Sequence, residues 1–161
     1  MDDEIRIPIE GDDDLVPARA EGRALAEKLG FSRTDATLIA TAISEIGRNI
    51  VVHVGRGELL LRPVSEPARC GIVVIARDEG PGIRDVEAAL NDGYASNRGL
   101  GLGLPGTRRL MDEFLIESEE GKGTTVRMTK WRARDELERL RERRGEMADP
   151  SEHLPEVDAP D

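Results

Sequence analysis

Two glycine-rich segments and one carboxylate are the residues of this chain best suited to bind a ligand. An apolar run through Ile75 delivers Asp78 into a glycine-rich turn, Asp78-Glu-Gly80-Pro-Gly82-Ile83. A second loop, Gly99-Leu-Gly-Leu-Gly103-Leu-Pro105-Gly106, then leads into a helix. Glycines let the backbone approach a ligand closely, and a helix N-terminus attracts anions. A carboxylate with two such loops predicts a pocket for a base with a phosphate tail, and adenine nucleotide is the natural candidate.

Two other glycine motifs resemble parts of this region. The spacing Gly101-Leu-Gly103-Leu-Pro-Gly106 fits the dinucleotide-binding fingerprint, but no hydrophobic strand precedes it and no acidic residue follows about 20 residues on. Gly121-Lys122 resembles the end of a P-loop, but Gly123 stands where Ser or Thr is required. The sequence therefore favours neither motif.

A second chemical feature is the pair Glu45 and Asn49. They lie four residues apart in a predicted helix, so they share one face, one turn apart. A solvated helix face is the plain interpretation of this pair taken alone. His53, one turn further on, is a helix-end residue or borders the pocket, and the sequence also leaves open whether Arg48 contributes.

The elements that must position these residues follow from periodicity and turn signals. Alternating Ile5, Ile7 and Ile9 predict an edge strand that tolerates Pro8. Further strands are expected over 58–64, 70–77, 114–119 and 124–131, the last two joined as a hairpin. Helices are expected over 15–29, with an N-cap from 12–14 and an end at Gly30, over 33–53 with a Ser32 cap, over 85–90, and from Pro105 to 112. Residues 91–98 are small and polar, as in a mobile lid.

Composition limits the class of protein. The 161 residues are most simply one domain with one core. A net charge of −10 argues against general nucleic-acid binding. The single cysteine, Cys70, excludes a disulfide framework and favours a reducing compartment. No signal peptide or apolar membrane-spanning run is visible, so we expect a cytoplasmic protein without a membrane partner.

The C-terminal composition differs from the rest. Residues 132–144 are dense in Arg and Glu and predict a solvated helix, and the acidic, Pro-containing stretch beyond Met147 predicts disorder. We therefore predict an ATP-binding domain over 1–131 and a charged helix with an acidic tail over 132–161.

The order of these motifs resembles the GHKL (Bergerat) ATP-binding fold of gyrase, Hsp90, histidine kinases and bacterial anti-sigma-factor kinases. Glu45-Ile-Gly-Arg-Asn49 is similar to its N-box, Asp78 to Gly82 to its adenine box, Gly99 to Gly103 to its phosphate box, and Gly123-Thr-Thr125 to its closing Gly-Thr. Within that superfamily, 41–50, 104–114 and the ending Thr129-Lys-Trp131 resemble the RsbT-type serine/threonine switch kinases. The likeness implies an α/β (α+β) two-layer sandwich, in which helices cover one face of a mixed, largely antiparallel sheet.

The resemblance also implies roles for individual residues. Asp78 would accept a hydrogen bond from the adenine amino group, with Thr125 or Thr124 holding a water beside it. Asn49 would ligate Mg²⁺, and Glu45 would orient or deprotonate the attacking hydroxyl. The remaining ATP-binding residues implied by the boxes are Gly80, Gly82, Ile83, Gly99, Leu100, Gly101, Leu102, Gly103 and Leu104.

Three functions are carried forward. The resemblance implies an ATP- and Mg²⁺-dependent protein serine/threonine kinase that phosphorylates a STAS-domain scaffold or antagonist protein and activates a PP2C-type phosphatase. An anti-sigma factor that phosphorylates its antagonist shares the fold. A nucleotide-binding adaptor without catalysis is the third. The oligomeric state, the substrate residue and the stimulus are left open.

Overall fold

The computed structural model describes residues 4–90 and 103–147 and has the expected alternation of strands and helices. In chain order the elements are β1 (Ile5–Ile9), the 3₁₀ turn η1 (Asp12–Asp14), α1 (Leu15–Lys28), α2 (Arg33–His53), β2 (Gly57–Ser65), β3 (Arg69–Asp78), α3 (Val86–Ala89), α5 (Gly103–Leu110), β4 (Glu113–Glu119), β5 (Gly123–Ala133) and α6 (Glu136–Met147).

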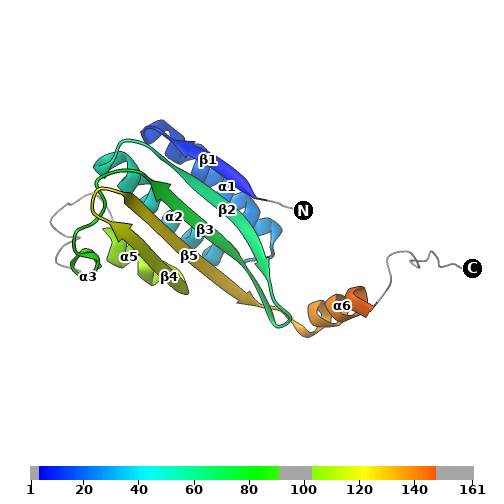
Figure 1. Ribbon diagram of the computed structural model, residues 1–161. Helices are drawn as coiled ribbons and strands as arrows, with labels where there is room; N and C mark the ends of the chain where they lie inside the picture. The colour runs from blue at the N-terminus through cyan, green and yellow to red at the C-terminus, as the bar shows by residue number, and fades with distance from the viewer. Residues whose placement is uncertain (1–3, 91–102, 148–161) are drawn as a thin grey trace, which may run out of the picture.

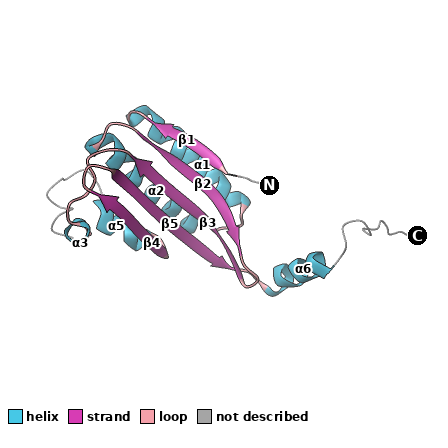
Figure 2. Ribbon diagram, in the orientation of Figure 1, coloured by secondary structure: helices cyan, strands magenta, loops and turns pink. Residues whose placement is uncertain are grey.

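The strands form one five-stranded sheet in the order β1-β2-β3-β5-β4. Helices α1, α2 and α5 lie on one face of it, so the predicted two-layer sandwich is confirmed (Figures 1 and 2). All four ladders between these strands are antiparallel. A parallel dinucleotide-binding sheet is thereby excluded for this part of the chain. Strand β1 is at the edge of the sheet. The missing backbone N–H of Pro8 therefore does not interrupt pairing with a second neighbouring strand.

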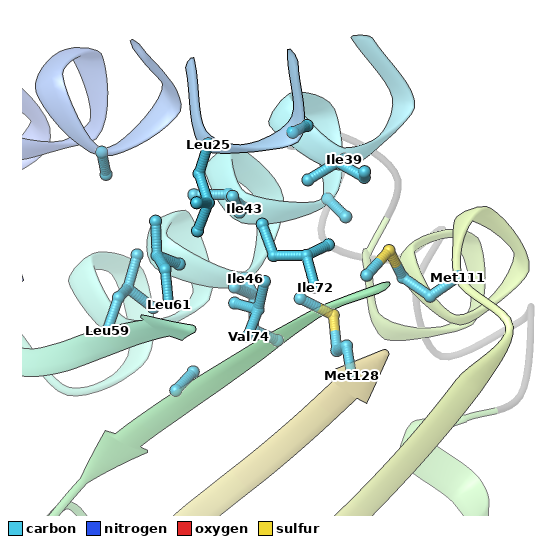
Figure 3. Packing of buried hydrophobic residues seen from close by; sticks show 14 of the residues in the cluster. Leu25, Ile39, Ile43, Ile46, Leu59, Leu61, Ile72, Val74, Met111 and Met128 are labelled. Atoms are coloured by element: carbon cyan, nitrogen blue, oxygen red, sulfur yellow. The ribbon is translucent and has the colours of Figure 1, made fainter. Parts of the chain in front are cut away.

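The core lies between α2 and the sheet. Ile39, Ile43 and Ile46 of α2 are buried against apolar side chains of β2, β3 and β5, as Figure 3 shows. The sheet residues in this cluster include Leu59, Leu61, Ile72, Val74 and Met128. These isoleucines form a stripe along one face of α2, which holds the opposite face of the helix away from the core.

Helices α1 and α2 approach each other closely at Gly22. A Cβ atom there would lie 2.1 Å from Cδ1 of Ile43. Any larger residue would have to displace the end of that side chain, so Gly22 makes room for Ile43 between the two helices.

The helix ends follow the predictions in part. Ser32 Oγ accepts the Asp35 N–H at 3.1 Å, and Gly30 ends α1 with φ of 91°. Asp14 is the N-cap residue of α1, as expected, but its side chain makes no capping hydrogen bond. The Asp14 carboxylate instead accepts the N–H of Glu10 at 2.7 Å, because 12–14 already form a 3₁₀ turn.

Helix α5 begins earlier than predicted. Its first residue is Gly103, so Pro105 lies inside the first turn rather than starting the helix. This costs no hydrogen bond, since N–H groups of a first turn have no partner within the helix.

Helix α6 is attached to the sheet through Arg132, and it lies at the end of the sheet opposite α3 (Figure 1). Arg132 Nε donates to the carbonyl of Leu29 at 2.8 Å, and its two terminal nitrogens contact the Glu138 carboxylate at 3.0 and 2.6 Å. These bonds, with one from the Asp135 N–H, lower the pKa of Glu138 to about 2.

Strand β5 continues to Ala133, while the domain boundary after residue 131 stays a prediction. Within the described residues, no helix combines the length and apolarity needed to cross a bilayer.

Candidate active site

One cavity of about 370 Å³ gathers most of the described residues that were predicted from sequence. It lies between the C-terminal half of α2, the ends of β3 and β5, helix α3 and the start of α5. A volume of this size is within the range of small-molecule sites. The predicted residues that line it are Glu45, Asn49, Asp78, Gly82, Ile83, Gly103, Leu104 and Thr124.

One wall of the cavity is the face of α2 that carries Glu45 and Asn49. Because the isoleucine stripe faces the sheet, this face is turned to the cavity and is not a plain solvated surface. The side chain of Glu45 is 14% exposed, and its Oε2 lies 3.3 Å from Nη1 of Arg48. Arg48 and His53 also line the cavity.

The floor of the cavity comes from two adjacent strands. In the β3–β5 register Ala76 is opposite Val126, and Asp78 is opposite Thr124. Alternate residues of a strand share a face, so this floor runs from an apolar part to a polar end. Thr125 is opposite Arg77 on the other face of the sheet and does not line the cavity. Of the two threonines considered from sequence, Thr124 is the one at the cavity.

The turn after Asp78 is held by its own carboxylate. Asp78 Oδ1 accepts the N–H of Gly80 at 2.9 Å. Gly80 is not in the lining; a Cβ there would lie 2.6 Å from a methyl group of Val54. The Asp78 side chain makes no further hydrogen bond within the described part of the chain, which leaves its second oxygen with acceptor capacity for a ligand N–H.

The same turn is fastened to the β4–β5 hairpin. Gly82 has φ of 79°, and a Cβ on it would lie 2.3 Å from the carbonyl oxygen of Glu119. The N–H of Gly121 donates to the carbonyl of Pro81 at 2.7 Å. Glycine is therefore required at position 82 both for its backbone angle and for this close approach. The hairpin turn leads into β5, not into a helix, so 121–122 are not part of a P-loop.

Ser118 is a site residue that sequence reasoning missed. Its Oγ accepts the N–H of Ile83 at 2.7 Å, donates to the carbonyl of Gly123 at 3.2 Å and lies 2.8 Å from Oγ1 of Thr124. It thus joins the adenine-box turn to the predicted closing threonine. Alternation along β4 could have placed Ser118 on the helix-covered face with Phe114 and Ile116, but nothing local indicated its partners.

The other lining residues unpredicted from sequence are mainly apolar. Asp85 caps α3 by accepting the Ala88 N–H at 3.1 Å, and Ala88 and Ala89 then face the cavity. These additional residues are Ile46, Ile50, Val52, Val54, Ala76, Pro81, Arg84, Asp85, Ala88, Ala89 and Val126.

Helix α5 brings its N-terminal residues, Gly103 and Leu104, to the cavity. N–H groups at a helix N-terminus suit phosphate. The remainder of the predicted phosphate loop, Gly99, Leu100, Gly101 and Leu102, and the predicted lid over 91–98 lie outside the described residues.

The donor set fits an adenine nucleotide. Apolar walls suit a flat base, the Asp78 carboxylate suits its amino group, and the start of α5 suits phosphate. Within 4–90 and 103–147 no group of three or more His, Cys, Asp or Glu side chains is arranged to hold a metal. Mg²⁺ in nucleotide sites commonly takes one or two protein oxygens besides phosphates and waters, and Asn49 can supply one.

Comparison with known proteins agrees with this geometry. Residues 10–130 match the model of the histidine kinase-like ATPase domain. The serine/threonine-protein kinase RsbT of Bacillus subtilis (strain 168) is 43% identical over 131 residues, covering 81% of this chain and 98% of the relative. An anti-sigma F factor of Caldanaerobacter subterraneus is 35% identical, covering 73% of this chain and 85% of the relative. This chain therefore belongs to the histidine kinase-like ATPase family, among the RsbT-type serine/threonine-protein kinases.

Proposed function

We propose that this chain is a cytoplasmic, Mg²⁺- and ATP-dependent serine/threonine kinase that phosphorylates a STAS-domain protein and then acts as a partner switch by activating a PP2C-type phosphatase. Its kinase class follows from the family. The choice of substrate and partner rests on the resemblance of 41–50, 104–114 and 129–131 to the switch kinases.

The observation that carries the proposal is the composition of the cavity described above. A carboxylate for the adenine amino group, an amide oxygen for the metal, a helix N-terminus for phosphate and a second carboxylate line the same space. A site for binding alone does not need the second carboxylate, Glu45, on the wall that also carries Asn49. This combination supports phosphoryl transfer.

The roles proposed for the residues follow from their chemistry. Asp78 accepts the adenine amino hydrogen bond, and Thr124 holds a water beside it. Asn49 contributes one oxygen to Mg²⁺, and the start of α5 binds phosphate. Bound Mg-ATP supplies the transferable phosphoryl group.

Glu45 is proposed to orient the attacking hydroxyl of the protein substrate and take its proton. A general base must come within hydrogen-bond reach of that proton, directly or through one water. Because phosphoryl transfer depends mainly on positioning and charge neutralisation, a carboxylate on a rigid, packed helix is well suited to this task.

The test is Glu45→Gln, with Glu21→Gln on the exposed surface of α1 as matched control. Loss of a general base typically costs about 10²–10⁴-fold in rate. We expect Glu45→Gln to bind ATP within a few-fold of wild type and to phosphorylate a STAS-domain substrate at least about a hundredfold more slowly. Single-turnover phosphorylation at saturating ATP measures this step. Transfer at the wild-type rate by Glu45→Gln refutes the role of Glu45.

A second candidate function is favoured by the anti-sigma F factors among the relatives, two of which are 35% and 33% identical. In that case the chain would bind a sigma factor as well as phosphorylate an antagonist. The partners recovered with the full chain distinguish the candidates: a STAS-domain protein with a PP2C-type phosphatase supports the switch kinase, and a sigma factor supports the alternative. ATP binding without transfer to either class of substrate would favour an adaptor.

A further inference from the structure

Among the described residues, the basic side chains that line the cavity are Arg48, His53 and Arg84, and Arg48 forms an ion pair with the proposed base. Arg84 is 87% exposed, and its nearest carboxylate oxygen is on Glu120 at 4.0 Å. His53 is eight residues beyond Glu45, about 12 Å along the helix at 1.5 Å per residue. Arg48 is on the turn between Glu45 and Val52 and lines the cavity with both.

Arg48 contacts Glu45 directly. Nη1 of Arg48 is 3.3 Å from Oε2 of Glu45, and the two side chains are 37% and 14% exposed. The Arg48 side chain is therefore the more exposed of the pair. Glu45, Arg48 and Asn49 follow one another at i, i+3 and i+4, so a base, a cation and an amide oxygen share one helical face.

Repulsion between the Glu45 carboxylate and a bound triphosphate favours a cation at this position. A carboxylate base that approaches a triphosphate brings two negative groups together, which opposes binding of the terminal phosphate. A guanidinium stays ionised and has five N–H donors, more than a single carboxylate uses. It can therefore hold Glu45 and bind phosphate oxygens at the same time.

We propose that Arg48 is a phosphate-binding residue of this site, which contacts the terminal phosphoryl group of ATP while it holds the Glu45 carboxylate. The inference rests on the proposed function and adds a residue that the sequence motifs did not assign. It predicts that Arg48 distinguishes ATP from ADP, because only ATP carries the terminal phosphate.

The experiment compares Mg-ATP and Mg-ADP affinities by titration calorimetry in wild type, Arg48→Met and Arg48→Lys. Arg33→Met, an exposed arginine in the first turn of the same helix, is the matched control. We expect Arg48→Met to bind ADP within about twofold of wild type but ATP at least about tenfold more weakly, the size of one hydrogen bond to a charged group. Arg48→Lys should recover part of the loss, since it keeps the charge without the planar fork. Arg33→Met should bind both nucleotides like wild type.

A double variant tests whether Arg48 contacts phosphate or only neutralises the charge of Glu45. If Arg48 contacts phosphate, adding Arg48→Met to Glu45→Gln should still weaken ATP binding more than ADP binding, compared with Glu45→Gln alone. If this difference disappears in the Glu45→Gln background, or if Arg48→Met and Arg48→Lys keep the wild-type ratio of ATP to ADP affinity, the inference is wrong while the proposed function stands. Failure of the wild-type chain to bind either nucleotide would instead overturn the proposed function. Should Arg48→Met lower the melting temperature, Arg48→Gln provides the same comparison.

Discussion

Asp78→Asn replaces one carboxylate oxygen by an amide group without changing the size of the side chain. The remaining carbonyl oxygen can still accept the Gly80 N–H, which is 2.9 Å from Oδ1 in the native protein. The turn after β3 should therefore survive. The new NH₂ group takes the place of the oxygen that is available to a ligand, so a donor would face the adenine amino donor.

The expected rise in the Kd for ATP follows from the loss of one charged hydrogen-bond acceptor. A hydrogen bond to a charged group contributes about 1.5–3 kcal/mol, which corresponds to about 10- to 150-fold in Kd. The unpaired amide adds to that loss in a cavity with apolar walls. We therefore expect the Kd for ATP to rise at least about a hundredfold.

Titration calorimetry measures the Kd, and thermal unfolding in the absence of nucleotide reports whether the fold is kept. Asp85→Asn is the matched control, since Asp85 also lines the cavity but caps α3, and Asn is an equally good cap. Its ATP affinity should equal that of wild type. An Asp78→Asn protein with native melting temperature and a Kd within threefold of wild type would refute the assignment of Asp78 to the base.

Three further predictions test the metal, the hairpin and the C-terminal attachment. Asn49→Ala should raise the Mg²⁺ concentration needed for half-maximal ATP binding and leave Mg²⁺-free binding unchanged; equal Mg²⁺ dependence contradicts the ligand role. Gly123→Ala should destabilise the fold by about 1–3 kcal/mol in urea unfolding, because φ is 101° and the added Cβ would lie 2.2 Å from the Asp78 carbonyl oxygen. The Glu138 pKa is lowered to about 2 from 4.5, so its bond to Arg132 contributes fully above about pH 4.5 and is lost as pH falls toward 2. An NMR titration of the Glu138 carboxyl carbon should show a midpoint near 2 that returns toward 4.5 in Arg132→Met, and an unchanged midpoint in that variant would exclude the pairing as its cause.

Most of the helices and strands were predictable because the signals that define them act between residues close together in the chain. The isoleucines of α2 recur with the helical period, so the face of α2 that is buried follows from spacing alone. Ser32 acts on an N–H three residues away, and its cap is predictable for the same reason. Asp14 departs from this pattern, since its carboxylate accepts the N–H of Glu10, four residues before it, and makes no capping bond to α1.

The site was predictable in its parts and less so in its assembly. The order of Glu45, Asn49, Asp78 and the glycine loops is visible in the chain, as is the shared helical face of the first two. The contribution of Ser118 was not, because its partners Ile83 and Thr124 come from a separate turn and strand. Hydrogen bonds of this kind depend on how a loop folds back over a hairpin.

The sequence by itself thus determined which chemical groups are present, which helix face carries Glu45 and Asn49, and where the backbone needs glycine. Only the tertiary structure decided that Thr124, not Thr125, reaches the cavity, and that Arg48 pairs with Glu45 in its lining. The physical reason is that side chains alternate along a strand, so a pattern defines two faces but not which one the helices cover. That choice depends on the register of β5 against β3, which brings Thr124 opposite Asp78 across about 46 residues of intervening chain.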